Sequence, residues 1–406
     1  MRLQGKMLAA GVACTMAVAA LMVPTATAAK PTLTVWIQPS KAAALEAVAS
    51  DYKAANIVVV EQPGDTRDLL QTVAVEDAPD IFEGAHDWTG ELQSNGSVKA
   101  ISLPGPVAAQ FLSKDLDAFK YDGALLGVPM LHESIAFAMN TDIAGKTCPA
   151  TLDQAVSRVE GKLDKGKINT IIQVGGSNAY MWYPMMSGLG GAFFKQKANG
   201  EYTTQTLVHK TSDTKQKTNI IKGWNASGLF DHSQGNGSAS GPFSKSKAAY
   251  YITGPWESNA IRDLSATMNI KLCKFPTIIP GIKSIPFSGV RGFYVSKFAK
   301  QHGVLSAAKD FVISYLSSAK AQKKFCKLDG CNPSNKNAGV SPNPFTADFL
   351  VTYPDAVPMP NIPEMAAIWG NVAAAWDAAM AEEDSTNPKV AFANAADNIR
   401  SSISGG

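Results

Sequence analysis

The chain has 406 residues, of which 45% are hydrophobic and 17% are charged, and its formal net charge is +3. So small a positive excess gives no reason to expect nucleic acid or an anionic surface as a partner. About 377 residues follow a predicted leader, more than one hydrophobic core supports, so we expect two lobes.

Residues 1–29 have the three parts of a secretory leader. Arg2 and Lys6 give a positive start, residues 7–23 form an uncharged apolar run, and residues 26–28 (ATA) are small enough for cleavage. We therefore expect the mature chain to begin near Ala29 and to lie in the periplasm or another extracytoplasmic compartment.

Two alternatives concern the same segment. The apolar run of about 17 residues is at the short limit for a membrane-spanning helix, but its Ala and Gly content and the cleavage site favour a leader. Residues 11–14 (GVAC) loosely resemble a lipoprotein box that would place a lipid on Cys14. Gly is poor at the first box position and apolar residues continue past the cysteine, so we expect Cys14 to be removed with the leader.

Four cysteines remain in the mature chain, an even number in a compartment where disulfides persist. Cys326 and Cys331 flank a short loop turned by Asp329-Gly330, and we predict that they pair, which leaves Cys148 for Cys273. The sequence alone allows three connectivities. Metal binding is the competing interpretation, but the five histidines do not cluster with these cysteines at ligand spacing, so no metal site and no cofactor are expected.

The mature chain begins with an alternation of strands and helices. Apolar runs predict strands at 33–37, 57–60 and 81–82, and helical spacing predicts helices at 42–55 and 65–75. This alternation indicates parallel pairing in an α/β lobe. Ligands of such sheets bind beyond the carboxyl ends of the strands, which draws attention to the residues after the first and third strands.

Further along the chain the pattern is less regular. A helical, polar stretch follows residue 140, and residues 175–194 are rich in Gly and aromatic side chains. Loop composition spans 231–241. The remaining predicted elements are strands at 134–140, 248–253 and 290–295, and helices at 307–316 and 365–380.

Seven stretches in this order resemble the maltose/maltodextrin-binding proteins of ABC importers. They are LTVWIQPSK at 33–41, APDIFEGAHDWTGEL at 78–92, GVPMLHESIAFAMNTD at 127–142, AYMWYPMMSGLGGAFF at 179–194, AAYYITGPWESNAI at 248–261, KDFVISYLSSAKAQKKF at 309–325 and MPNIPEMAAIWGNV at 359–372.

The resemblance implies an α/β, two-lobed, type II periplasmic-binding-protein-like fold with a hinge and a ligand cleft between the lobes. It implies an N-terminal lobe of residues 30–133 plus 290–338 and a C-terminal lobe of 134–289 plus 339–406. The implied partners are an oligosaccharide of the maltose/maltodextrin type and the membrane permease subunits of an ABC importer; we expect a monomer and no nucleic-acid partner.

A sugar offers hydroxyl groups on its rim and C–H groups on its faces, so a sugar site needs carboxylates or amides together with exposed aromatic rings. His86 and Asp87 follow a predicted strand end, and the resemblance places Asp87 and Glu133 at the family's sugar-binding carboxylate positions. The alternative for either carboxylate is a helix cap or a surface charge. We assign His86 to the structure rather than to the ligand.

The resemblance also places aromatic rings on the sugar faces. Trp256, Trp369 and Tyr180 match the family's stacking positions, and Tyr183 stands where the family has a Trp. Packing in the core is the ordinary alternative for such residues.

Departures from the family pattern change the expected cleft. Ser40-Lys41 replaces an Asp-Lys pair, Gly84 replaces a Trp, and Trp88 replaces an Arg. Asn178 lies near a family Glu, and Glu83 and Trp88 are candidate replacements for the lost groups. Together with Lys41, these positions complete the predicted site, whose sugar could differ from linear maltodextrin.

Other functions remain to be weighed. A glycoside hydrolase would also carry a carboxylate pair and aromatic rings, but Asp87 and Glu133 have no independent mark of an acid–nucleophile pair, and we expect no catalytic residues. The same fold could instead bind trehalose, another disaccharide, a cyclic glucan or a non-sugar solute such as a polyamine or iron complex. A structural or adhesive protein would lack a hinged cleft. We expect hinge segments near 131–136 and 286–291.

Overall fold

The structure is a computed structural model that describes residues 29–62, 66–175, 178–198, 200–233, 241–381 and 385–405. Residues 1–28 of the predicted leader, with Cys14 and the residues 26–28, lie outside these ranges. The chain divides into a unit of Met1–Lys30 and a unit of Pro31–Gly406. Everything that follows concerns the second unit.

The first sheet opens with the predicted alternation of strands and helices. β1 (Thr32–Ile37) pairs in parallel with β2 (Asn56–Glu61) and with β3 (Ile81–Ala85), as expected. α1 (Pro39–Ala49) begins before the predicted residue 42 because a proline suits the first helical turn, and it ends six residues before the predicted residue 55. α2 spans Thr66–Thr72.

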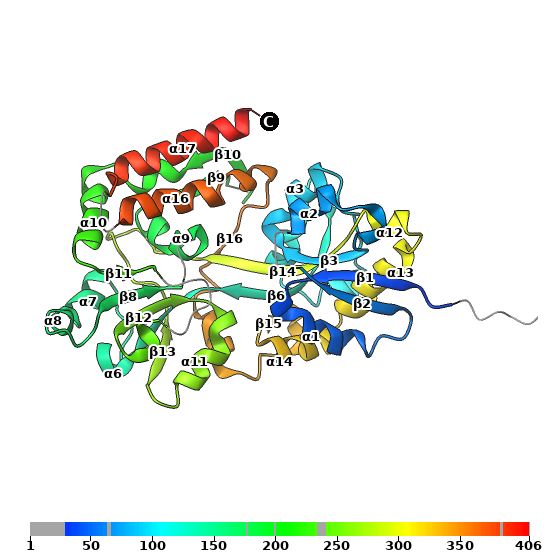
Figure 1. Ribbon diagram of the computed structural model, residues 1–406, viewed down its shortest axis with the longest axis horizontal. Coiled ribbons are helices and arrows are strands. Elements are labelled where there is room, and N and C mark those ends of the chain that lie inside the picture. The colour runs from blue at the N-terminus through cyan, green and yellow to red at the C-terminus, as the bar shows by residue number, and fades with distance from the viewer. Residues whose placement is uncertain are drawn as a thin grey trace, which may run out of the picture. The chain divides into compact units, whose positions relative to one another are not determined.

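Two long antiparallel strands complete the middle of this sheet. β6 (Gly127–Ser134) pairs with β14 (Phe287–Val295), and the sheet order is β15-β6-β14-β3-β1-β2, with β16 also paired to β14. The predicted strand at 134–140 is divided at Ile135, where the chain leaves the first sheet and enters β7 (Ala136–Asn140) of the second. β6 and β14 run side by side between the two sheets in Figure 1.

The second sheet has the order β11-β8-β12-β7-β13. β12 (Ala248–Thr253) is the strand predicted from its apolar run, and every residue of it is buried. β8 (Thr170–Val174) was not predicted, although it too is fully buried and pairs in parallel with β12. The outer strands are β11 (Phe230–Asp231) and β13 (Ile270–Cys273).

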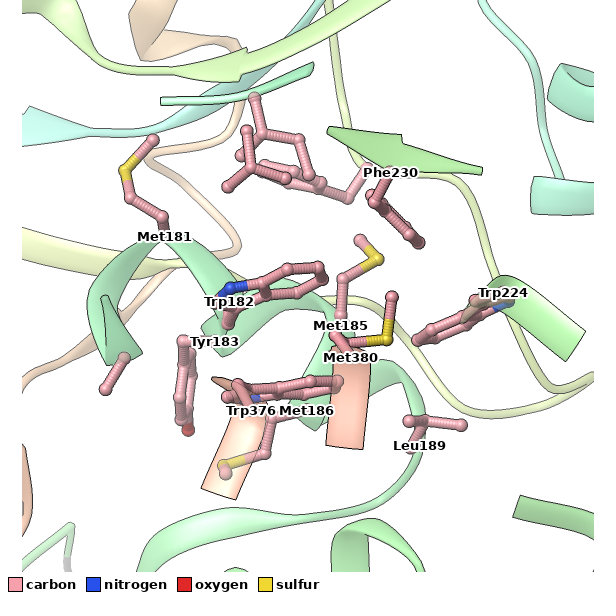
Figure 2. Packing of buried hydrophobic residues seen from close by; sticks show 14 of the residues in the cluster. Met181, Trp182, Tyr183, Met185, Met186, Leu189, Trp224, Phe230, Trp376 and Met380 are labelled. Carbon is pink, nitrogen blue, oxygen red and sulfur yellow. The ribbon is translucent and has the colours of Figure 1, made fainter. Parts of the chain in front are cut away.

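Helices α9 (Ala179–Gly188), α16 (Trp369–Met380) and α17 (Pro388–Ser404) lie on the second sheet's side of the molecule (Figure 1). Half of the glycine- and aromatic-rich stretch 175–194, for which no element was predicted, is thus the helix α9. Figure 2 shows why this helix is stable: Trp182 of α9 stacks on Trp376 of α16, with ring centroids 4.7 Å apart and planes at 13°, and methionines fill the space around the two rings.

The remaining helices and strands complete the two halves of the chain. The predicted helix at 307–316 is α13 (Leu305–Asp310) followed by a π-helical segment, Phe311–Leu316. Helices are α3 (Thr89–Ser94), α4 (Gly105–Ala108), α5 (Ser113–Ala118), α6 (Thr141–Ala144), α7 (Leu152–Ser157), α8 (Glu160–Leu163), α10 (Lys215–Ala226), α11 (Ser258–Leu264), α12 (Phe298–Gln301), α13 (Leu305–Asp310), α14 (Ala319–Asp329) and α15 (Pro344–Asp348). Strands are β4 (Lys120–Tyr121), β5 (Ala124–Leu125), β9 (Ala192–Gln196), β10 (Tyr202–Leu207), β15 (Asn332–Pro333) and β16 (Val357–Pro358).

Each sheet has its own buried core. The core of the first sheet centres on residues such as Leu33, Leu45 and Phe293, and that of the second on Trp182, Tyr250 and Trp376. The strands fall into the two stretches expected for the two lobes, except that β14 begins at residue 287 and β16 pairs with it. The residue limits of the lobes themselves stay a prediction.

The cysteines of the mature chain lie in two close pairs. The structure joins Cys148 to Cys273, which are 125 residues apart, and Cys326 to Cys331, which are five apart. Both pairs were predicted, Cys326–Cys331 from its short loop and Cys148–Cys273 by elimination. Within the described residues, no helix is long and apolar enough to cross a membrane.

Candidate ligand-binding cleft

A cavity of about 640 Å³ lies between residues on or next to strands of the first sheet and residues of segments that pack beside the second sheet, such as α9 and α16. This volume falls in the range of small-molecule sites, roughly 300–1,000 Å³. Eight of the nine predicted ligand-binding residues line it, and Tyr183 does not. The lining consists of Gln38, Ser40, Lys41, Arg67, Ala85, Asp87, Trp88, Glu133, Asn178, Tyr180, Met181, Trp256, Gly289, Val290, Arg291, Met359 and Trp369.

Asp87 reaches the cleft because it follows β3, at the carboxyl end of a strand that pairs in parallel with β1. It lies in the one-turn helix η2 (His86–Trp88). Its Oδ2 accepts a hydrogen bond of 3.2 Å from the indole Nε1 of Trp369, the first residue of α16. The carboxylate therefore already bonds to a group on the opposite wall of the cleft.

Glu133 lies near the end of β6, opposite Gly289 of β14. A Cβ at position 289 would lie 2.9 Å from Cγ of Glu133 and 3.2 Å from Oη of Tyr180, so only glycine leaves room for both side chains. Burial raises the pKa of Glu133, and the positive charges of Arg291 and Lys41 oppose that rise only in part. Glu133 thus offers the cleft a carboxyl group that is easier to protonate than an exposed one.

Three cations on this wall are held by carboxylates. Arg291 donates to Glu83 through Nε and Nη2, at 2.5 and 2.9 Å. Lys41 pairs with Asp329 at 2.9 Å, and Arg67 pairs with Glu91 at 3.2 Å. Burial disfavours the charged form of Arg291, but Glu83 and Glu133 outweigh it and raise the pKa of the guanidinium. Glu83 is therefore a partner of Arg291 and does not line the cleft, contrary to its candidacy as a replacement ligand group.

Trp88 covers Gly84. A Cβ at position 84 would lie 2.5 Å from Cε3 and 2.6 Å from Cζ3 of the Trp88 ring, so the indole occupies the space that a side chain at 84 would need. The guanidinium carbons of Arg67 and Arg291 lie 5.1 and 5.9 Å from the ring centroid, within reach of cation–π attraction. The glycine at position 84 is thus what makes room for the indole at position 88.

The opposite wall supplies three aromatic residues from three separate elements. Tyr180 lies in the first turn of α9, Trp256 in the one-turn helix η5 (Pro255–Glu257), and Trp369 at the start of α16. The ring of Trp256 lies over Gly254, where a Cβ would come within 2.3 Å of it, and 43% of the residue is exposed. Among the described residues none forms a hydrogen bond with Tyr180 Oη, although this atom is buried.

Other residues singled out from the sequence have structural roles. Oδ1 of Asn178 caps α9 by accepting from the Met181 amide at 3.0 Å, so this cleft residue also fixes the start of the helix. Tyr183 lies in the core, where its ring stacks on Phe287 with centroids 3.5 Å apart; Figure 2 shows it among the other buried side chains. The structure therefore corrects its assignment to the site.

His86 is buried, and burial lowers its pKa, so the ring is neutral. Its Nδ1 accepts from the Val290 amide at 3.1 Å, which ties η2 to β14. This contact agrees with the structural role predicted for it.

Several lining residues were not foreseen from the sequence. Arg291 could have been suspected, because it is the one charge in the otherwise uncharged strand Phe287–Val295, and a charge in a buried strand needs a partner. Arg67, Met181 and Met359 carry no such signal. Within the described ranges, no group of three or more His, Cys, Asp and Glu side chains could hold a metal ion.

Comparison with known proteins gives a consistent assignment. Residues 43–352 match the family described as bacterial extracellular solute-binding protein. The maltodextrin-binding protein MdxE of Bacillus subtilis is 24% identical over 85% of this chain and 84% of its own length, and the galactooligosaccharide-binding protein of the same species is 24% identical over 83% and 82%.

A solved structure, the Thermus thermophilus maltotriose binding protein bound with maltotriose, aligns with a TM-score of 0.76 at 23% identity and covers 91% of this chain and all of that one. The fold is thus the two-lobed type II periplasmic-binding-protein fold with its cleft between the lobes, as the sequence indicated. The family consists of proteins that bind solutes rather than transform them. This chain belongs to the bacterial extracellular solute-binding proteins, and its resemblance to the maltodextrin-binding members is confirmed.

Proposed function

We propose that this chain captures a neutral oligosaccharide, maltodextrin or a related glucoside, in the cleft and delivers it to the membrane permease of an ABC importer. The observation that carries the proposal is the chemical difference between the two walls of the cleft. Asp87 and Glu133 offer hydroxyl acceptors on one wall, and Tyr180, Trp256 and Trp369 offer aromatic surfaces on the other. A pyranose presents the complementary pair of surfaces, a rim of hydroxyls and a face of C–H groups.

The charges of the cleft favour a neutral ligand. Each of the three cations that line it is paired with a carboxylate, so none calls for an anionic solute. The flat rings of Tyr180, Trp256 and Trp369 suit the C–H face of a sugar, which a polyamine does not have. Tyr180 adds a buried hydroxyl that a ligand hydroxyl would satisfy.

The names of the relatives support an oligosaccharide without fixing which one. Curated relatives are named for maltodextrin, galactooligosaccharide and maltooligosaccharide, at about 24% identity. This chain also has Ser40 and Trp88 in the cleft lining, and Gly84 beneath Trp88, where the maltodextrin pattern differs. Trehalose, another disaccharide and a cyclic glucan are therefore the ligands to compare with linear maltodextrins.

Binding is expected to close the lobes about the hinge segments. A ligand that touches Asp87 on one wall and Trp256 on the other interacts with both only when the lobes are close together, so it favours the closed form. The Asp87–Trp369 hydrogen bond would be exchanged for ligand contacts in that step. The closed form would be the one that the permease recognises.

Isothermal titration with maltose, maltotriose, trehalose and a cyclic glucan tests the ligand class, with spermidine as the charged control. We expect saturable heat with at least one of the sugars and none with spermidine. A chain that is silent to every sugar would refute the proposal. Small-angle scattering with the sugar that binds should show a smaller radius of gyration than without it.

The extracytoplasmic location agrees with the family to which the chain belongs. Cleavage of the leader near Ala29, rather than lipid attachment at Cys14, remains part of the proposal. Mass spectrometry of the exported protein would distinguish the two by the mass of its N-terminal peptide.

A further inference from the structure

A short stretch of chain around residue 353 joins the two halves of the molecule beside the proposed hinge. Phe349 belongs to a buried cluster of the second sheet, together with residues of β7 and β12. Thr352 Oγ1 then donates to the carbonyl of Ile135 at 2.9 Å, at the point where the chain passes from β6 to β7. The next residue, Tyr353, makes its contacts with the first sheet's side instead, so the stretch is tied to both halves within a few residues.

Tyr353 is held by two successive residues of α5, a helix whose Leu116 lies in the core of the first sheet. The hydroxyl Oη donates to Oδ1 of Asp115 at 2.5 Å, and Asp115 is fully buried. Lys114 Nζ donates to the backbone carbonyl of Tyr353 at 2.8 Å. The side chain and the backbone of Tyr353 are thus fixed to the same helix.

The ring of Tyr353 is enclosed as well. Lys114 Nζ lies 3.3 Å from the ring centroid, within reach of cation–π attraction, and the imidazole of His132 stacks on the ring with centroids 4.6 Å apart. This stacking does not depend on which imidazole nitrogen carries the proton. Only 5% of Tyr353 is exposed. We call Lys114, Asp115 and His132 together the Tyr353 socket.

The socket is occupied while the two walls of the cleft are in contact. Asp87 on one wall accepts a hydrogen bond from Trp369 on the other, as described above. Neither Tyr353 nor Lys114 nor Asp115 is among the described residues that line the cleft. These three residues can therefore influence a ligand only through the positions of the two walls.

We propose that the Tyr353 socket positions the hinge: it holds the connecting stretch in the arrangement in which the walls of the cleft meet, and so tunes the affinity for every ligand. The proposal rests on the oligosaccharide binding and hinge closure proposed above, and it adds residues that act on affinity without touching the sugar. A contact that favours the closed form raises the closed fraction, and the apparent affinity follows that fraction whatever contacts the sugar makes.

Two tyrosine-to-phenylalanine variants test the proposal. Tyr353→Phe removes the hydroxyl and keeps the ring in the socket. Tyr315→Phe is the matched control, because Tyr315 Oη donates to the carbonyl of Val48 at 2.7 Å and this contact lies entirely on the first sheet's side. Isothermal titration with maltose and with maltotriose should show both affinities of Tyr353→Phe lowered by the same factor, roughly three- to tenfold, the effect of one hydrogen bond. Tyr315→Phe should lower the melting temperature to a similar extent and keep both affinities within twofold of the wild type.

Two results would overturn the proposal. If Tyr353→Phe lowers the melting temperature but binds both sugars like the wild type, the socket only stabilises the fold. If it weakens the two sugars by different factors, the residue acts on the ligand itself. Should Tyr353→Phe fail to fold, Lys114→Met takes its place under the same criteria, because it removes the bond to the carbonyl and keeps a long side chain.

Scattering separates a failure of this inference from a failure of the proposed function. If neither sugar binds the wild type, the proposed ligand is wrong, and the socket is tested without any ligand. The radius of gyration of sugar-free Tyr353→Phe should then exceed that of the wild type, and that of Tyr315→Phe should not. Equal radii for all three proteins would refute the socket's role in the hinge.

Discussion

The two walls of the cleft are built from different chemistry. Lys41, Arg67, Asp87, Glu133 and Arg291 all lie on the wall that belongs to the first sheet, whereas the described lining residues of the opposite wall are uncharged. The opposite wall instead carries Tyr180, Trp256 and Trp369, at the starts of helical segments. Trp88 is the exception, an indole on the charged wall.

This difference follows from what each group requires when water is removed. A charge in a closing cleft must be paired, so the three cations of the first wall are fixed to Glu83, Glu91 and Asp329 on the same sheet or its helices. An aromatic ring has no such requirement, and it can remain exposed until a ligand covers it. The charged wall is therefore organised before binding, and the aromatic wall is completed by the ligand.

Removal of Trp256, the most exposed ring of the aromatic wall, should have the largest effect on sugar binding. Trp256→Ala takes away about 100 Å² of apolar contact, so sugar affinity should fall roughly 50- to 100-fold. Trp256→Phe should recover most of that loss because it keeps a flat ring. The melting temperature without sugar should hardly change, since 43% of the residue is exposed. Titration that shows wild-type affinity for the alanine variant would mean that the ligand does not stack on this wall.

Variants of Gly84 and Trp88 test whether Trp88, the indole on the charged wall, contributes to sugar binding. Gly84→Ala should displace the indole, because the new Cβ would lie 2.5 Å from its Cε3, and sugar affinity should fall about tenfold. Trp88→Ala should have a similar effect. Since the glycine would act only through the ring, the double variant should bind no more weakly than Trp88→Ala alone.

The control for this cycle is Gly105→Ala, where an added Cβ meets no atom within 4 Å. It should bind sugar like the wild type. Titration of the wild type, the two single variants, the double variant and the control decides the matter. If Gly84→Ala weakens binding further in the Trp88→Ala background, Gly84 has a role of its own and the interpretation fails.

The sequence was informative where the pattern is local. Apolar runs located β1, β2, β3 and β12, and the order of strands and helices predicted the parallel pairing. The helix α9 was not predicted within the Gly- and aromatic-rich stretch, because packing of Trp182 on Trp376, nearly 200 residues later, stabilises it. The helix propensity of a short stretch of sequence carries no information about such a distant contact.

The cleft shows the same limit. Residues that follow strand ends, such as Asp87, could be placed from the order of elements alone. Tyr183 could not, because the residue type that stacks on a sugar is the same type that packs on Phe287. The Glu83–Arg291 pair joins residues 208 positions apart, and only the register of β3 against β14 brings them together. Which aromatic or charge faces the ligand is thus a property of the tertiary structure.

Glu133 gives the smallest effect and the sharpest test of the charged wall. Burial raises its pKa in the folded chain, so the folded state holds this proton more tightly than the unfolded state does. The stability that this group contributes is therefore present below its unfolded pKa and is lost as the pH rises through the folded value. Glu133→Gln removes the titration. The melting temperature of the variant relative to the wild type should increase between pH 4 and pH 8, while sugar affinity at pH 7 falls several-fold.

Asp142 is the matched control of opposite sign. Hydrogen bonds from the backbone and side chain of Asn269 lower its pKa, so its contribution is present above the unfolded pKa and is lost as the pH falls. Asp142→Asn should therefore lose stability relative to the wild type toward pH 8, with sugar affinity unchanged because the residue is not in the cleft lining. Thermal melts of the three proteins across this pH range compare the two slopes directly. Parallel curves for Glu133→Gln and the wild type would show that the carboxylate is fully compensated by Arg291 and Lys41, and that the charged wall carries no electrostatic strain before the ligand arrives.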